Sequence, residues 1–352
     1  MRILYGVQGT GNGHLTRARA MATALVEHPH TDVQFLISGR EQTRLFGIQP
    51  LGDYWWRDGL SFATRNGRVS VVDTISHNPW WKFWHDVHHL DLSSFDLVVT
   101  DFEPVTAWAA KRQGVPCIGL GRQYAFTQAH SSLPSTALQR AMIKQFAPCQ
   151  IALGTHWRPL NDYTLPPIIE PADNCDLAAH ANRYLVYLPF EPLAEIADLL
   201  VQLHTLVPHY TFDVFHPEAT AATTPNAVFH APSRSGFQQA FAPAQGVISN
   251  AGFGTSSEAL AAGKKLLIKP LKGQFEQYAN AHYLDAQKLA TVCLSLDAQA
   301  LLAWLKEPDA AQLSWPQVAP QLAQWLMDPR RGDVRQLAQR LWSQTLDTRR
   351  RA

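Results

Sequence analysis

Residues 247–281 read VISNAGFGTSSEALAAGKKLLIKPLKGQFEQYANA, and this stretch decides the fold. The apolar residues 247–249 predict a strand, and a glycine-rich turn then leads into a helix that ends at Gly263. A second apolar strand, a polar loop and a second helix follow. Strands that alternate with helices in this way form parallel sheets. The stretch therefore predicts an α/β fold with polar residues after each strand.

A helix that begins at a glycine-rich turn can bind a phosphate. Its first amides have no partners inside the helix, and the helix dipole is positive at that end. Glycine has no side chain, so an anion can approach the backbone closely. The candidate anion-binding residues are Gly252, Gly254, Thr255 and Ser256. The alternative is a capping box, in which Thr255 and Glu258 satisfy each other's backbone amides. The spacing is compatible with both.

A second polar motif follows the next predicted strand, residues 265–269. Pro270, Gln274, Glu276 and Gln277 return polar groups to the carboxyl edge of the sheet, where open α/β sheets bind ligands. The glycine turn with its Thr and Glu, followed by Pro-x-x-x-Gln-x-Glu-Gln-x-x-Asn-Ala, resembles the donor site of nucleotide-sugar glycosyltransferases of the GT-B type. It is most similar to inverting relatives of the peptidoglycan N-acetylglucosaminyltransferase.

The resemblance implies a role for each residue of the two motifs. The glycine turn and Thr255 would hold the diphosphate of a nucleoside-diphosphate sugar, with UDP as the favoured nucleotide. Glu258 would bind the ribose hydroxyls, and Glu276 with Gln277 would recognise the sugar, with Gln274 beside them. The fold implied is a pair of Rossmann-like domains facing a central cleft.

The N-terminal turn resembles the acceptor side of the same family. A predicted strand at residues 2–7 leads into Gly-x-Gly-x-Gly-His, which ends at His14. The turn lacks the dinucleotide pattern GxGxxG, and no GK[ST] follows, so the dinucleotide interpretation is weak and the P-loop interpretation fails. By the resemblance, Gly11 and Gly13 would admit the acceptor and His14 would be the general base. Otherwise a histidine at a helix start is an exposed or capping residue.

An acidic pair follows another predicted strand, residues 95–100. Asp101 follows the carboxyl end of this strand, and a helix begins at Pro104. The resemblance would pair Asp101 with His14, fixing its tautomer so that the other ring nitrogen can take the acceptor proton. Alternatively, Asp101 or Glu103 only stabilises the helix N-terminus. Glu103 is also a candidate acceptor-side residue.

The strand at residues 115–120 ends near Gln123, another candidate acceptor-side residue.

The stretch 77–89, which precedes the predicted strand at residues 95–100, is rich in Trp and His. It would either line an acceptor pocket or form an amphipathic helix or packing layer. The stretch contains His85, His88 and His89, whose helical spacing permits a metal pair. No matching third ligand is visible in the sequence, so we assign no metal.

The chain is long enough for two domains, since it has 352 residues of which 46% are hydrophobic and 17% charged. We predict an N-terminal acceptor-binding domain at 1–165 and a linker at 166–182, which is rich in Pro, Asn and Asp. A nucleotide-sugar donor domain would occupy 183–328. A C-terminal helix in 329–352 would pack back on the N-terminal domain, as the resemblance implies.

The composition limits the classes of partner that we expect for this protein. Lys plus Arg number 30 against 29 Asp plus Glu, so a net charge of +1 argues against general affinity for nucleic acid. The acceptor would be a small molecule, a glycan or a lipid-linked compound, and the arginines at 349–351 allow weak membrane-surface contact. Four scattered cysteines without a CxxC pair fit a reducing cytosol. No segment has about 18 uninterrupted apolar residues, so we expect a cytoplasmic protein.

The stereochemical prediction is inversion at the anomeric carbon. Retaining relatives carry a second acid about two turns after the helix glutamate, and Lys264 and Lys265 occupy that neighbourhood here. Backbone amides would stabilise the leaving diphosphate, so neither a divalent metal nor another cofactor would be required. Two alternatives stay open: a sugar-nucleotide epimerase on the same fold, and a non-catalytic sensor that binds sugar nucleotides.

Overall fold

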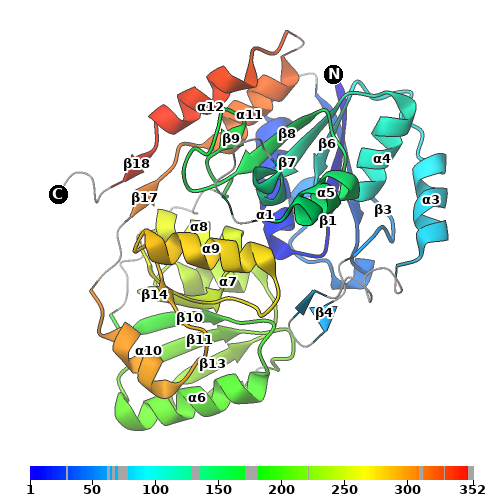
Figure 1. Cartoon of the computed structure of the whole chain (residues 1–352). Helices are drawn as coiled ribbons and strands as arrows, with labels where there is room; N and C mark the ends of the chain where they lie inside the picture. Colours follow the sequence, from blue (N-terminus) through cyan, green and yellow to red (C-terminus); the bar gives the residue numbers. More distant parts are fainter. Residues whose placement is uncertain are drawn as a thin grey trace. The chain divides into compact units, whose positions relative to one another are not determined.

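The computed structural model describes residues 1–28, 31–61, 64–65, 68–69, 78–127, 133, 135–170, 181–220, 222–308, 312–328 and 330–347. Most of the predicted linker, Cys175 and the arginines at 349–351 lie outside these residues. The chain divides into two compact units. Unit 1 comprises Met1–Pro171 and Trp315–Thr345, and unit 2 comprises Ala172–Ser314 and Leu346–Ala352. Figure 1 shows the helices and strands of both units.

Unit 1 is built on a parallel sheet with strand order β3-β2-β1-β6-β7-β8-β9. Strands β1, β6 and β7 are buried along most of their length, which explains their continuous apolar sequences. The chain leaves β1 for β2 on one side and returns to β6 on the other. Such a switch point is where open sheets bind ligands. The strands are β1 (Arg2–Gln8), β2 (Asp32–Ser38), β3 (Tyr54–Trp56), β6 (Leu97–Asp101), β7 (Cys117–Gly121), β8 (Ile151–Thr155) and β9 (Thr164–Leu165).

Helices cover both faces of this sheet. The apolar stripe of α1 packs with α11 and α12 in one core cluster, while α3 and α4 belong to the cluster on the other face. A short antiparallel pair, β4 (Thr64–Arg65) and β5 (Arg68–Val69), is separate. The helices are α1 (Asn12–Val26), η1 (Gln42–Arg44), η2 (Gln49–Leu51), α3 (Trp80–His89), α4 (Pro104–Gln113), η3 (Arg122–Phe126), α5 (Ala137–Phe146), α11 (Val318–Met327) and α12 (Val334–Ser343).

Unit 2 repeats the architecture with strand order β12-β13-β11-β10-β14-β15-β16, parallel except for the pair β12–β13. Helices α6 and α10 lie together against one face of this sheet (Figure 1). The elements are β10 (Arg183–Tyr187), α6 (Leu193–Leu206), β11 (Thr211–Phe215), β12 (Ala222–Thr224), β13 (Ala227–His230), α7 (Arg234–Phe241), β14 (Gly246–Asn250), α8 (Phe253–Ala261), β15 (Lys265–Lys269), α9 (Phe275–Ala286), β16 (Thr291–Val292), α10 (Ala298–Leu305), β17 (Leu313–Ser314) and β18 (Leu346–Asp347). The predicted α/β fold with two Rossmann-like sheets is confirmed.

The chain returns to unit 1 at Trp315, whereas we predicted the return at residue 329. Leu322 and Leu326 of α11 are buried in the same cluster as α1. The apolar periodicity of residues 316–327 identifies an amphipathic helix, but periodicity cannot tell which sheet that helix covers. Helix α12 also packs in unit 1, where Trp342 donates its indole N–H to the carbonyl of Thr164 at 2.6 Å.

The aromatic stretch forms the amphipathic helix α3, one of the alternatives that the sequence left open. Phe83 and Val87 are buried against the sheet, while Trp81 is 75% exposed. The ring nitrogens of two histidines approach carbonyls one turn earlier, His88 to Trp84 and His89 to His85. Packing of Phe83 and Val87 thus accounts for the buried face of α3.

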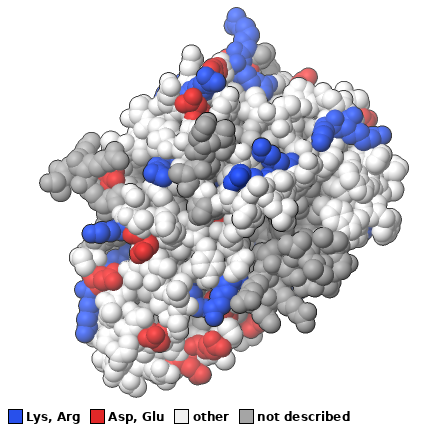
Figure 2. Space-filling model, in the orientation of Figure 1, with Lys and Arg blue, Asp and Glu red and all other residues white. Residues whose placement is uncertain are grey.

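Charge is mixed on the molecular face that Figure 2 shows, where basic and acidic side chains are interspersed among uncharged ones. Within the residues that the structure describes, no helix is both long and apolar enough to cross a membrane. Nor do the described residues gather three or more His, Cys, Asp or Glu side chains in a group that could hold a metal ion.

Candidate active site

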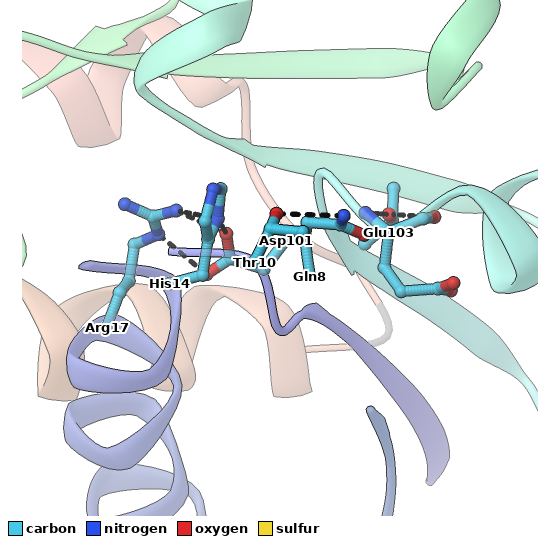
Figure 3. Close-up of polar contacts among 7 residues, drawn as sticks. Gln8, Thr10, His14, Arg17, Asp101 and Glu103 are labelled. Carbon is cyan, nitrogen blue, oxygen red and sulfur yellow. Dashed lines mark hydrogen bonds and ion pairs between the residues drawn. The ribbon is translucent and has the colours of Figure 1, made fainter. Parts of the chain in front are cut away.

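The candidate site of unit 1 lies at the switch point of its sheet. His14 is in the first turn of α1, directly after β1, and Asp101 is the last residue of the neighbouring strand β6. The His14 Nδ1 atom is 2.6 Å from Asp101 Oδ1 (Figure 3). The structure thus brings together the two residues that the sequence analysis paired. Parallel strands end at the same sheet edge, which is why side chains 87 residues apart meet.

Arg17 completes this cluster, and sequence reasoning missed it. Its Nε donates to Asp101 Oδ2 at 2.7 Å, and its Nη2 donates to Asp101 Oδ1. Asp101 is fully buried. Burial favours protonation of Asp101, but the charge of Arg17 and then the interaction with His14 outweigh it and hold the pKa of Asp101 below its ordinary value. The carboxylate is therefore ionised at neutral pH. The available signal was the spacing of three residues between His14 and Arg17, which places both on one helix face.

The imidazole of His14 is held from the side as well. Its ring stacks on Phe102, with ring centroids 6.5 Å apart and planes 10° apart. Phe102 has φ of 55°, a left-handed conformation that is rare for a bulky residue and often marks a functional turn. A Cβ atom on Gly11 would come within 3.3 Å of the His14 ring, whereas one on Gly13 would meet nothing within 4 Å. Gly11 therefore keeps the surroundings of the ring open.

Glu103 does not face an acceptor as we predicted. Its side chain is fully buried at the N-cap of α4 and accepts hydrogen bonds from two backbone amides, Val105 N at 2.8 Å and Thr106 N at 2.7 Å. The Ser38 and Thr106 hydroxyls, both at 2.6 Å, complete the set. Burial raises the pKa of Glu103, although these four donors oppose the shift. Glu103 is thus a helix cap, the alternative role that its position before Pro104 allowed.

Gln123 lies beside the Arg17–Asp101 pair. Gly121, which ends β7 with φ of 155°, has Gln123 Oε1 and Arg17 Nη2 close to the place where a side chain would begin, at 3.2 and 3.4 Å from an ideal Cβ. A side chain there would disturb the cluster. The acceptor-side role of Gln123 stays a prediction.

Unit 2 has its own candidate site at the start of α8. The N-cap of α8 is Gly252, and no described side chain caps the helix. Thr255 is the third helical residue and not the N-cap, so the capping-box alternative is wrong. A Cβ atom on Gly252 would meet nothing within 4 Å. The start of α8 thus has an uncapped glycine turn with open space at Gly252, which is a geometry that can bind phosphates.

Two side chains flank this turn. Ser256 is fully buried, and its Oγ has no hydrogen-bond partner among the residues that the structure describes. Glu258 lies on the next turn of α8, where its Oε1 is 3.8 Å from Nη2 of Arg234 at the start of α7. The glutamate side chain is 15% exposed. Gly254 and Thr255 are partly exposed in the first turn.

The second donor motif divides between the surface and the interior. Gln274 is the N-cap of α9, and its buried Oε1 has no hydrogen-bond partner within the described chain. Glu276 is partly exposed in the first turn. Gln277, which we predicted to recognise the sugar, is buried, and its Oε1 accepts a hydrogen bond from Leu271 N at 3.0 Å. That oxygen fixes the loop before α9, and recognition of the sugar by Gln277 stays a prediction.

Three further polar residues at this edge were missed by the sequence analysis. Glu191 follows β10, Asn250 ends β14 and Lys269 ends β15, so all three lie where parallel strands stop. Lys269 and Glu191 form an ion pair. Asn250 Nδ2 donates to Lys269 O at 3.0 Å, and its Oδ1 is buried with no partner in the described residues. The signal was their position immediately after each apolar run.

Lys264 and Lys265 are buried and serve the ends of other helices. Lys264 Nζ donates to Ala242 O at 3.0 Å and Ala244 O at 2.6 Å, at the end of α7, while Lys265 Nζ reaches Leu305 O at the end of α10. Burial lowers the pKa of Lys264 to about 8. Cations at helix C-termini are favourable. Retaining relatives carry a second acid in this neighbourhood, and neither lysine provides a catalytic group in its place.

Comparison with known proteins gives matches to the sequence and to the fold. Residues 1–307 match the model of the family described as Glycosyl transferase family 1. No curated protein matches the chain significantly. Among solved structures, glycosyltransferase SnogD from Streptomyces nogalater is 17% identical with a TM-score of 0.58, covering 97% of this chain and 96% of its own. MurG from Acinetobacter baumannii is 16% identical with a TM-score of 0.51, covering 98% and 95%. SsfS6, a Streptomyces glycosyltransferase in complex with thymidine diphosphate, is 14% identical with a TM-score of 0.55, covering 97% and 95%.

Proposed function

The chain belongs to Glycosyl transferase family 1, and on that premise we propose that it is an inverting enzyme that moves a sugar from a nucleoside-diphosphate sugar to a hydroxyl acceptor. The observation that carries the proposal is the 2.6 Å contact between His14 Nδ1 and Asp101 Oδ1 at the carboxyl edge of unit 1. A carboxylate on one ring nitrogen leaves the other free to act as a general base. Such a base is what direct displacement at the anomeric carbon needs.

The reaction is a single displacement. The acceptor hydroxyl gives its proton to His14 Nε2, and its oxygen forms the new bond to the anomeric carbon. The bond between that carbon and the diphosphate breaks at the same time, and the electron pair leaves with the diphosphate. Asp101 stabilises the imidazolium that forms. The backbone amides at the start of α8, near Gly252, would stabilise the leaving diphosphate without a divalent metal.

The donor would be a nucleoside-diphosphate sugar whose nucleotide binds to unit 2. SsfS6 was solved with thymidine diphosphate, which supports a nucleoside diphosphate at this fold. We favour a uridine nucleotide because Glu258 would bind the 2′-hydroxyl that thymidine diphosphate lacks. Candidate acceptors are small molecules, glycans and lipid-linked compounds. A cytoplasmic location is favoured by the scattered cysteines.

We expect nucleoside diphosphate alone to stabilise the protein against heat, with or without EDTA. Ligand at about 100 times its dissociation constant contributes about 2.7 kcal/mol, which raises the melting temperature by several degrees. The measurement is a thermal-shift series with UDP, GDP and dTDP. A melting temperature that none of the three changes would contradict the proposed donor site.

The turn before α8 offers a matched pair of variants. Gly252 has φ of −72° and open space at its Cβ position, so Gly252→Asn and Gly252→Asp should both fold and cap α8 well. The aspartate adds a negative charge where the diphosphate would lie, so it should abolish the thermal shift, while the asparagine should reduce it less. Equal shifts in both variants would mean that the nucleotide binds elsewhere.

Product analysis separates the alternatives. A glycosyltransferase transfers the sugar to an acceptor or slowly hydrolyses the donor, with an inverted anomeric centre in the product. An epimerase changes the sugar nucleotide without an acceptor, and a sensor binds the nucleotide without consuming it. Proton NMR of a UDP-sugar incubated with the protein distinguishes the three results.

A further inference from the structure

The cluster around His14 gives Arg17 a function of its own. We propose that Arg17 is a positioning residue that balances the charge of Asp101 and thereby keeps His14 Nε2 free of a proton at neutral pH. This inference rests on the proposed function of His14 as the base. The residues come from α1 and β6, and Figure 3 shows their side chains pointing toward one another.

The orientation of Asp101 is set by the arginine. Nε of Arg17 donates to one carboxylate oxygen and Nη2 donates to the other, which is the two-point pairing that a planar guanidinium forms best. Arg17 is 6% exposed and Asp101 is fully buried. The carboxylate therefore cannot rotate without breaking both bonds. Its Oδ1 is kept at 2.6 Å from His14 Nδ1.

The same contacts determine the tautomer of the imidazole. His14 Nδ1 has two polar neighbours, Asp101 Oδ1 at 2.6 Å and Arg17 Nη2 at 3.0 Å. A carboxylate only accepts hydrogen bonds, and a guanidinium only donates them. A bare Nδ1 would set its lone pair against a charged oxygen at the shorter distance, so the hydrogen lies on Nδ1 and is donated to Asp101. Nε2 is then the basic nitrogen.

Arg17 also balances the negative charge of Asp101. With Arg17 present, the buried carboxylate is neutralised and the imidazole can stay uncharged. Without it, the buried negative charge of Asp101 would face the imidazole alone. The His14–Asp101 pair would then retain one additional proton to higher pH, shared as imidazolium with carboxylate or as imidazole with carboxylic acid. In either form the pair has lost the charge balance that lets it take the proton of the acceptor hydroxyl at neutral pH.

Other ionisable groups around the cluster would change little between wild type and variant. The phenols of Tyr5 on β1 and Tyr124 on η3 sense the charge of Asp101, and burial raises the pKa of both, so they stay neutral. Arg40 reaches the start of α1 through Thr10 O and stays charged. Glu103 keeps its four donors in both proteins, three on α4 and the Ser38 hydroxyl at the end of β2.

The test is the pH dependence of Arg17→Met, followed by donor hydrolysis so that no acceptor is needed. We expect the acid limb of the turnover profile to move up by at least about one pH unit, with activity recovering at alkaline pH and the donor KM unchanged. Arg17→Lys keeps the charge but not the two-point contact, so it should rescue part of the shift. Asp101→Asn should move the limb in the opposite direction.

Arg19→Met is the matched control. Arg19 lies two residues further along α1, is 5% exposed and also pairs with both oxygens of one acid, Glu170, at 2.7 and 2.9 Å. Both variants lose a buried ion pair, so both should melt at lower temperature. If Arg17 had only this structural role, neither variant would change the pH profile.

A second measurement needs no activity. Two-bond ¹H–¹⁵N correlation spectra of labelled histidines, assigned with His14→Gln, report which ring nitrogen carries a proton. We expect the hydrogen on Nδ1 in the wild type and an additional proton on the pair, lost only at higher pH, in Arg17→Met. If the spectra behave so and no transfer or hydrolysis occurs, the proposed function fails and this inference stands. An unchanged titration in folded Arg17→Met would overturn the inference, whatever the activity.

Discussion

His14→Ala should lower turnover by about 10² to 10⁴-fold, since that is the usual contribution of a positioned general base. The donor should bind nearly as before, because the proton leaves the acceptor in the transition state and plays no part in binding the nucleotide. Asp101→Asn should cost less at the pH optimum, since it removes the partner of the base and not the base itself. The measurement is turnover with donor affinity determined separately by calorimetry.

The control for this variant is His88→Ala, which removes an exposed histidine from α3. It should leave turnover unchanged. Near-normal turnover in His14→Ala would require another base. Glu103 is a poor substitute because its carboxylate is buried and already accepts four hydrogen bonds at the start of α4. Lowering the pH should also reduce wild-type activity, because a protonated imidazole cannot accept the acceptor proton.

The fold could be predicted from sequence because parallel strands have a strong local signal. Strands β1, β14 and β15 lie on apolar runs that we expected to be strands, since both faces of a covered sheet are buried. Glycines and prolines marked the ends of α4, which runs from Pro104 to the residue before the left-handed Gly114. Local chemistry was enough for these elements.

Placement of α11 and of several polar side chains could not be predicted in the same way. Helix α11 has an apolar face that fits either sheet, and only packing against α1 decides. Gln277 lies in a sugar-binding motif by sequence, yet its oxygen bonds the backbone of Leu271. Such contacts depend on how a loop folds back, which no spacing rule describes.

The polar residues of the candidate sites likewise divide into those that the sequence predicted and those that it missed. His14 and Asp101 were found because each follows a strand at a recognisable turn. Arg17 was missed because its partner is 84 residues away and its own position is unremarkable within a helix. Glu191 and Lys269 were missed for a similar reason, since their ion pair spans 78 residues. Sequence therefore indicates the edge of the sheet at which chemistry occurs more reliably than the network that tunes it.

Glu258→Ala should weaken donor binding about tenfold to a hundredfold, because a buried hydrogen bond to a charged group contributes roughly 1.5–3 kcal/mol. The structure removes the competing explanation: Gly252 is the N-cap of α8, so loss of the glutamate does not remove a capping box. The side chain is only 15% exposed and has one cation nearby, Arg234 at 3.8 Å. Calorimetry with UDP and a melting curve on the same variant measure affinity and stability together.

The nucleotide used as probe makes this prediction specific to the ribose. If Glu258 binds the ribose hydroxyls, the variant should lose more affinity for UDP than for 2′-deoxy-UDP, because the deoxynucleotide has already lost one of the bonds. Glu258→Gln keeps a hydrogen-bonding group without the charge and should lie between alanine and wild type. Glu195→Ala, which removes an exposed acid from the first turn of α6, is the control and should bind both nucleotides normally. An equal loss for the two nucleotides would show that Glu258 acts through the charge of Arg234 and the phosphates, and that the ribose is held by another group.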